Sequence, residues 1–282
     1  MKITKSQDVI GAEITGVDLA RLSADDFRRI EEAFNQHAVL CFHEQELDED
    51  QLLVFARRFG GITPNWLTHY THPRYPEILY VSNIKENGSD IGHADAGSVW
   101  HTDMSFTPKP PRATMLYALE VPMENGVALG NTLFASAADA HDSLPEAMQR
   151  RIAGLRVVHN LAGRRARTGT GAQSDQAMRR DKPDVVHPLV RTHPLNGRKC
   201  LYVNKGECVG IEGMETEAAL ALIGEMAERI VEPRFRHTHR WQVRDLLMWD
   251  NCSLQHLASF DYKWPRHRRL LERVMVEGSV PV

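Results

Sequence analysis

Short apolar runs separated by turn residues fill the middle and the end of this chain, and they constrain its fold most strongly. Between residues 78 and 136 the runs read ILYVSN, SVWHTDMSF, ATMLYALEV and NTLFAS. Three more, RFRHTHRW, DLLMWD and RLLERVMVEG, follow near the C-terminus. Runs of this length and spacing are typical of the strands of an all-β sandwich or barrel. The sequence therefore predicts a mainly β fold.

Helical patterns are fewer and lie around this β-rich region. Four stretches have the apolar periodicity of a helix: residues 27–34, 48–59, 145–153 and 214–230. The first follows Ser23 and Asp26, a pair that resembles a capping box. No linker, low-complexity tract or internal repeat divides the 282 residues. We expect a single domain, residues 1–282, with helices at its periphery.

The composition argues against large polyanionic partners. The chain has 34 Lys and Arg against 37 Asp and Glu, a net charge of -3, so neither nucleic acid nor an anionic membrane is expected to bind. No apolar run approaches the roughly 20 residues of a membrane span, and the first residues do not resemble a signal peptide. The four cysteines show no C-x-x-C spacing, which favours reduced thiols in a cytoplasmic protein.

Two His-x-Asp triplets are present, His93-Ala94-Asp95 and His101-Thr102-Asp103, which is about the number that chance predicts from 14 His and 37 acidic residues. The first lies in a polar, turn-like stretch and is expected to be a solvated loop. The second lies in VWHTDMSF, whose alternation predicts a strand with His101 and Asp103 on the same face. An imidazole and a carboxylate arranged in this way supply two thirds of the 2-His-1-carboxylate set that binds non-haem Fe(II).

His256, far along the chain, is the candidate for the second histidine ligand, although a packed or surface histidine is the simpler interpretation. The segment RHRRLLERVMVEG places Arg269 and Arg273 on one face of a predicted strand. Arginine is rarely buried without an anion. Two inward guanidinium groups beside a metal would favour ligands that carry carboxylates, whereas a solvated basic edge is the alternative.

Taken together, WHTDMSF, NTLFAS and WDN-x4-H-x4-DY followed by RR-x3-R resemble the Fe(II)/2-oxoglutarate dioxygenases of the taurine dioxygenase and 2,4-dichlorophenoxyacetate dioxygenase (TauD/TfdA) type. The similarity runs from about residue 18 to residue 278. It implies a double-stranded β-helix, a jelly-roll barrel with the iron at one mouth. It also implies roles for six residues: His101, Asp103 and His256 as iron ligands, Thr132 and Arg269 as the pair that holds 2-oxoglutarate, and Arg268 as the alternative anchor.

The resemblance extends to the substrate. In taurine dioxygenase the sulfonate meets a His and a Tyr of an HPxYP segment and an Arg four residues after the 2-oxoglutarate Arg. Here HPRYP supplies His72 and Tyr75, and Arg273 follows Arg269 by four. A small sulfonate or carboxylate substrate is therefore implied, unless HPRYP only shapes its loop. The stretch HADAGSV departs from the Asn- and Asp-rich stretch of taurine dioxygenase and argues against taurine itself.

The resemblance implies a hydroxylation that consumes O2 and 2-oxoglutarate and releases succinate and CO2. Halogenases on this scaffold lack the carboxylate ligand, so the presence of Asp103 favours hydroxylation. The same residues leave two alternatives open, a zinc hydrolase and a non-catalytic barrel that binds a small anion. Residues 162–184, rich in Arg and Gly, are expected to form a mobile loop, either solvated or closing as a lid. Similar enzymes are often dimers or tetramers, so a homo-oligomer is a further expectation.

Overall fold

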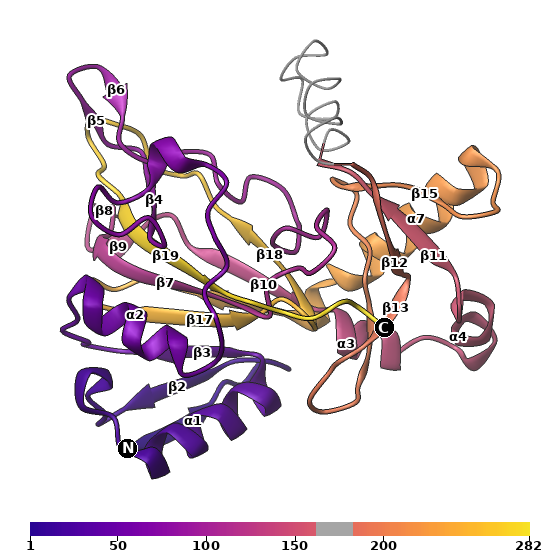
Figure 1. The fold of residues 1–282 in the computed structure, drawn as a ribbon, viewed down its shortest axis with the longest axis horizontal. Helices are drawn as coiled ribbons and strands as arrows, with labels where there is room; N and C mark the ends of the chain where they lie inside the picture. The colour runs from indigo at the N-terminus through magenta and orange to yellow at the C-terminus, as the bar shows by residue number, and fades with distance from the viewer. Residues whose placement is uncertain (162–182) are drawn as a thin grey trace.

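The largest sheet joins strands from both ends of the chain. The computed structural model describes residues 1–161 and 183–282 (Figure 1). Seven strands pair in the order β1 (Lys2–Lys5), β2 (Ala12–Thr15), β3 (Val39–Phe42), β17 (Leu246–Asp250), β7 (Ala113–Glu120), β19 (Leu270–Val276) and β4 (Leu79–Ser82). β2 and β3 pair in parallel, and the other neighbours are antiparallel. β17 therefore lies between β3 and β7, and β19 between β7 and β4, so the C-terminal segment is inserted between strands from the first half of the chain.

A smaller sheet packs on one face of this large sheet. Its strands are, in order, β16 (Arg236–His239), β10 (Thr132–Ser136) and β18 (Leu254–Ala258). Phe134 of β10 and Leu254 at the start of β18 belong to the same apolar cluster as Leu116, Leu247 and Leu271 of the large sheet. This apolar cluster lies directly beneath the cavity of the candidate site, since Leu116 belongs to both.

Two helices cover the opposite face of the large sheet (Figure 1), α1 (Ala24–His37) and α2 (Glu49–Arg57). The predicted helix after Ser23 is confirmed, because the Ser23 hydroxyl accepts a 3.0 Å hydrogen bond from the Asp26 amide. α2 begins with a reciprocal capping box between Asp48 and Gln51. Both helices bury their apolar stripes, including Phe34 and Phe55, against this face of the sheet.

The remaining elements form a second layered region (Figure 1). They are listed here in chain order: α3 (Ala137–Asp142), α4 (Glu146–Ile152), β11 (Arg156–His159), β12 (Val185–Pro188), β13 (Val190–Thr192), β14 (Lys199–Leu201), β15 (Cys208–Ile211) and α7 (Thr216–Ile230). Two short hairpins, β5 (Lys85–Glu86) with β6 (Ser89–Asp90) and β8 (Met123–Glu124) with β9 (Val127–Ala128), complete the strands in the described part of the chain. Three single-turn 3-10 helices cover Leu19–Arg21, Thr68–Tyr70 and Pro233–Phe235.

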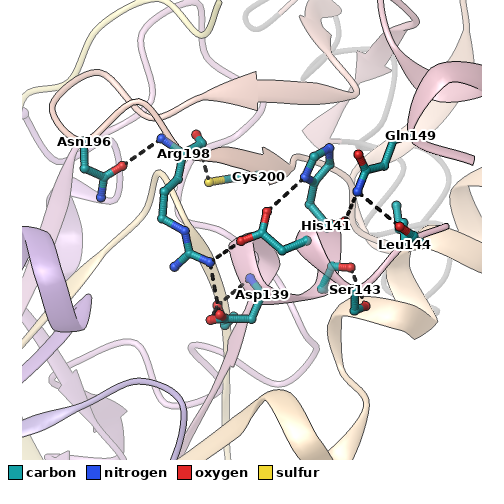
Figure 2. Close-up of polar contacts among 11 residues, drawn as sticks. Asp139, His141, Ser143, Leu144, Gln149, Asn196, Arg198 and Cys200 are labelled. Carbon is teal, nitrogen blue, oxygen red and sulfur yellow. Dashed lines mark hydrogen bonds and ion pairs between the residues drawn. The ribbon is translucent and has the colours of Figure 1, made fainter. Parts of the chain in front are cut away.

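An arginine fastens the connection between β13 and β14 to α3. Figure 2 shows Arg198 reaching Asp139, and its guanidinium lies 3.0 Å from that carboxylate and 2.6 Å from that of Asp142. This connection is a hairpin that turns at Asn196-Gly197, since β13 and β14 pair antiparallel and Gly197 has φ of 73°. The exposed ion pairs are expected to contribute little individually, but they orient α3 against the strands.

The predicted strand at residues 98–106 is wrong. Only His101 takes part in strand-like pairing, through an isolated bridge to His256. A turn starts at Asp103, and Met104 has φ of 50°, a left-handed conformation that interrupts an extended chain. The mainly β prediction with peripheral helices is confirmed. The expected lid at 162–184 lies almost wholly outside the described residues, and no helix in the described part of the chain is long and apolar enough to cross a bilayer.

Candidate metal centre and active site

His101 and His256 are brought together by backbone pairing. The His256 amide donates to the His101 carbonyl at 2.9 Å, and the His101 amide donates to the His256 carbonyl at 3.2 Å. His256 lies on β18, where it is paired with Phe134 of β10. The two imidazole rings are therefore adjacent, with centroids 4.1 Å apart. Strand pairing thus supplies the contact that the sequence could only suggest.

Asp103 completes a cluster of three donor atoms. Its Oδ1 lies 3.6 Å from His101 Nε2 and 3.8 Å from His256 Nε2. His101 Nδ1 lies 2.8 Å from the Val99 carbonyl, which can only accept, so Nδ1 carries the proton and Nε2 is a free lone pair facing the cluster. All three side chains are buried. These separations are too long for hydrogen bonds but suit ligands held at about 2 Å from one ion.

Three other groups of His, Cys and carboxylate residues in the described part of the chain differ from the Asp103 group in the distances between their donor atoms. They are Cys41 with His43 and Asp245, His193 with Asp250 and Cys252, and His72 with Glu49 and Glu272. In these groups a histidine nitrogen lies 2.8, 3.0 and 3.2 Å, respectively, from a carboxylate oxygen. Such distances are those of direct hydrogen bonds. The group around Asp103, in contrast, holds its donors apart and fits a metal ion.

The ionisation of Asp103 favours binding of a cation. Burial alone would raise its pKa, but the positive charges of His256 and Arg273 outweigh this effect and hold the pKa well below its ordinary value. The carboxyl group is therefore ionised at neutral pH and acts only as an acceptor. An ionised carboxylate beside two imidazole nitrogens is a donor set suited to Fe(II).

Arg269 and Thr132 line the same cavity as the three candidate ligands. Burial lowers the pKa of Arg269, while contact with Tyr262 opposes this effect. Thr132 Oγ1 accepts a 3.1 Å hydrogen bond from the Trp241 indole, so its own proton is available to another acceptor. Arg268 lies on the outside, where it forms an ion pair with Glu120 at 2.7 Å. The geometry therefore separates the two neighbouring arginines, and only Arg269 reaches the cavity.

A second hollow adjoins the first, and Arg273 lines both. The hollows also share His101 and Asp103, so they meet at the candidate metal centre. One side of the second hollow is apolar and aromatic, whereas His93, His101, Asp103 and Arg273 supply polar groups. The apolar side is lined by Trp66, Leu67, Met104, Phe106 and Leu161. A cationic group facing an apolar wall suits an organic anion with an apolar body.

His93 is a residue whose position the sequence did not indicate. It was expected in a solvated loop, yet its side chain lines the second hollow and its ring stacks on Tyr70 with centroids 5.8 Å apart. The His93 amide is held by the Tyr80 carbonyl at 2.8 Å. Its His-x-Asp triplet was the available signal, but that spacing occurs as often by chance. Trp66 and Phe106 were missed because apolar residues in loops carry no periodicity.

His72 and Tyr75 lie elsewhere. His72 Nδ1 accepts hydrogen bonds from the Arg74 and Tyr75 amides at 3.1 and 3.2 Å, and its Nε2 is 3.2 Å from Glu49. The group that contains His72 also includes Glu272, which neighbours Arg273 on β19 and so projects from the opposite face of the strand. Neither His72 nor Tyr75 is among the described residues that line the two hollows. Their placement favours the loop-shaping interpretation of HPRYP.

Relatives of known activity share this architecture. A 2,4-dichlorophenoxyacetate dioxygenase that depends on α-ketoglutarate, from Burkholderia sp. (strain RASC), is 34% identical over 260 residues, which cover 88% of this chain and 85% of the relative. Pentalenolactone F synthase of Streptomyces avermitilis is 33% identical, with 94% and 90% covered. The crystal structure of AAD-2 with Mn(II) and N-oxalylglycine has a TM-score of 0.81 and 28% identity, with 99% and 98% covered.

These relatives do not support the zinc hydrolase or the non-catalytic barrel. N-oxalylglycine is an analogue of 2-oxoglutarate, and the neighbouring AAD-2 structure contains it together with Mn(II). Residues 2–275 match the family described as taurine catabolism dioxygenase TauD, TfdA family. The chain therefore belongs to the TauD/TfdA family and is an Fe(II)- and 2-oxoglutarate-dependent dioxygenase.

Proposed function

We propose that this dioxygenase hydroxylates a small organic anion with an apolar body, and that it releases succinate and CO2. The position of Arg273 carries this proposal, because it lines both the cavity of the candidate metal centre and the adjoining hollow. A carboxylate or sulfonate paired with Arg273 would bring the apolar remainder of the substrate against Trp66 and Phe106, whose rings contact edge to face at 6.4 Å.

His101, Asp103 and His256 would hold Fe(II). The donor separations of 3.6 and 3.8 Å and the low pKa of Asp103 support this role. When bound, Fe(II) and 2-oxoglutarate supply the O2 activation that no side chain provides. The protein contributes a fixed donor set and a buried site from which bulk water is largely excluded.

Arg269 and Thr132 would bind the far carboxylate of 2-oxoglutarate. Arg269 is 3% exposed, and a buried guanidinium is stabilised by an anion that accepts two of its hydrogen bonds. Thr132 contributes a hydroxyl whose acceptor position is already used by Trp241. The two residues would therefore orient the cosubstrate from one side of the cavity, while Arg273, which lines both hollows, would face the substrate.

An aromatic or otherwise apolar monoanion fits the described wall better than taurine does. Taurine carries an ammonium group. Asp103, the carboxylate among the described residues of this hollow, would be engaged by the metal, and Trp66, Phe106 and Leu161 offer no counter-charge. The related enzymes named for 2,4-dichlorophenoxyacetate and for sulfonates act on organic anions. These names support the anion class, and the apolar wall supports the apolar body.

The wider expectations belong to the same proposal. The two facing sheets and the match over residues 2–275 support a jelly-roll barrel and a single domain that spans residues 1–282. We also propose that the protein acts on a small molecule, binds neither nucleic acid nor membranes, and is located in the cytoplasm. It would form a homo-oligomer of two or four copies. The net charge of -3 supports the exclusion of polyanions.

Anaerobic titration of the protein with Fe(II) and 2-oxoglutarate tests the cofactor roles. A visible charge-transfer band is expected in the parent and is expected to weaken strongly in Asp103→Ala. Succinate release is then screened over aryloxyalkanoates, aliphatic carboxylates and sulfonates. Arg273→Ala should raise the KM of the best anion at least tenfold, since a hydrogen-bonded pair with a partly buried charged group contributes roughly 2 kcal/mol. Unchanged turnover in Arg273→Ala would refute the substrate assignment.

A further inference from the structure

Asp103 uses its two carboxylate oxygens differently. Oδ1 faces His101 and His256, whereas Oδ2 accepts a 2.6 Å hydrogen bond from the Thr114 hydroxyl. Asp103 lies in a turn, outside the regular strands, so backbone pairing does not fix its side chain. Thr114 lies on β7 in the middle of the large sheet and is fully buried. A rigid strand thus holds one oxygen of a residue in a turn.

The direction of this hydrogen bond follows from the groups behind Thr114. The Trp249 indole, which can only donate, lies 3.1 Å from the Asn251 side-chain oxygen. The amide nitrogen of Asn251 must therefore face Thr114, and it donates to Thr114 Oγ1 at 2.9 Å. Because that interaction uses the hydroxyl as acceptor, the Thr114 proton is left to Asp103. Every donor along this chain points toward the carboxylate.

The same series of hydrogen bonds, from Trp249 through Asn251 and Thr114 to Asp103, also reaches the second histidine ligand. Asn251 lies in the turn between β17 and β18, and its backbone amide donates a 2.8 Å hydrogen bond to the Arg112 carbonyl. The Trp249 ring packs on the His256 ring with centroids 4.7 Å apart. Asn251 is fully buried, and Trp249 is 2% exposed. The hydrogen bonds and this ring contact together link Asp103 and His256 through the interior.

We propose that Thr114 is a positioning residue, oriented by Asn251 and Trp249, that turns Asp103 so that Oδ1 alone faces the metal. The inference rests on the proposed role of Asp103 as an iron ligand. A carboxylate that offered both oxygens would occupy a position that the cosubstrates need. Loss of a group that orients a metal ligand typically weakens metal binding by about ten- to a hundredfold.

Calorimetric titration of the metal-free protein with Mn2+ tests the inference without turnover. Thr114→Val keeps the size of the side chain but removes the hydroxyl, and it should weaken Mn2+ binding by roughly ten- to a hundredfold. Thr114→Ser retains the hydroxyl and should restore most of the affinity. Asn251→Asp should also weaken binding, because the new carboxylate competes with Asp103 for the single Thr114 proton.

Thr102→Val is the matched control. Thr102 is also buried and neighbours Asp103, but its hydroxyl donates to the Leu254 carbonyl at 3.0 Å instead of to a ligand. Its Mn2+ affinity should stay close to that of the parent. Parent-like affinity in a folded Thr114→Val, equal loss in Thr102→Val, or no recovery in Thr114→Ser would each overturn the inference. Failure of the parent itself to bind Mn2+, or binding that survives Asp103→Ala, would instead overturn the proposed function.

Discussion

Two adjacent arginines show how strongly position decides the role of a side chain. Arg268 is exposed and holds Glu120 with two hydrogen bonds of 2.7 and 2.9 Å, whereas Arg269 is buried in the wall of the cavity. Arg269 is fixed at its backbone, where its amide donates to Asn83 and its carbonyl accepts from Ser82. The strand that follows therefore starts with Arg269 already directed inward.

Exchange of these arginines for glutamine separates their roles. Arg269→Gln should raise the Kd of 2-oxoglutarate by roughly ten- to a hundredfold, since charge-assisted hydrogen bonds contribute about 1.5–3 kcal/mol. Arg268→Gln removes only an exposed ion pair and should leave the Kd unchanged. Anaerobic titration, with the charge-transfer band as the signal, measures both. A larger effect from Arg268→Gln would reverse the assignment.

At this scale the sequence indicated the donor set but not its surroundings. His101, Asp103 and Arg273 were indicated by the ordered set of motifs that resembles the TauD/TfdA family, because the His-x-Asp spacing alone occurs as often by chance. Thr114 and Asn251 could not, because a buried threonine or asparagine has the same sequence pattern whether it bonds to a ligand or to the backbone. His93 was assigned to solvent, since only the packing of Tyr70 and the hollow reveals its environment.

At the scale of elements, the two faces of β19 lie in different environments. Arg273 projects toward the cavity, while Glu272 projects toward α2, where it lies with Glu49 and His72. Burial, together with the charge of Glu49, raises the pKa of Glu272 to about 7. The folded protein thus binds a proton at Glu272 more tightly than the unfolded chain does.

The pH dependence of stability follows from this shift. Between pH 4.5 and about 7 the unfolded chain loses the proton while the folded protein keeps it, so Glu272 makes the protein less stable as the pH rises. Glu272→Gln should leave stability unchanged at pH 4 and increase it at pH 8, by up to about 3 kcal/mol. Thermal unfolding at both pH values measures the difference. Exposed Glu225→Gln is the control for the loss of a surface carboxylate. A parent-like Glu272→Gln at pH 8 would contradict the shift.

The success of the sequence predictions also varied by element. The two N-terminal helices and β7, β17 and β19 were predicted because their apolar spacing agrees with their burial. The segment 98–106 has the same alternation, but the left-handed conformation of Met104 interrupts the extended backbone. No Gly, Pro or Asn in this segment indicates a turn. His101 still reaches His256 because one bridge suffices for two ligands to meet. The contact between the two histidines was thus anticipated despite an incorrect element, and their role as iron ligands stays a prediction.

At the scale of the whole molecule, the candidate ligands tie distant parts of the chain together. His101 and Asp103 precede β7, and His256 lies on β18, between two strands of the C-terminal segment. Unfolding must separate these donors, so an ion bound by all three stabilises only the folded state. At a metal concentration of 100 times Kd the stabilisation is about 2.7 kcal/mol.

This linkage gives a test of the single-domain proposal. Mn2+ at 100 times Kd should raise the Tm of the parent by roughly 5 °C and should shift one unfolding transition as a whole. His256→Ala should abolish the shift, whereas His93→Ala, which lines the hollow but is not proposed as a ligand, should retain it. Differential scanning calorimetry with and without Mn2+ measures both quantities. Two transitions of which Mn2+ moves only one would show that the region outside the site unfolds independently, and residues 1–282 would then comprise more than one cooperative unit.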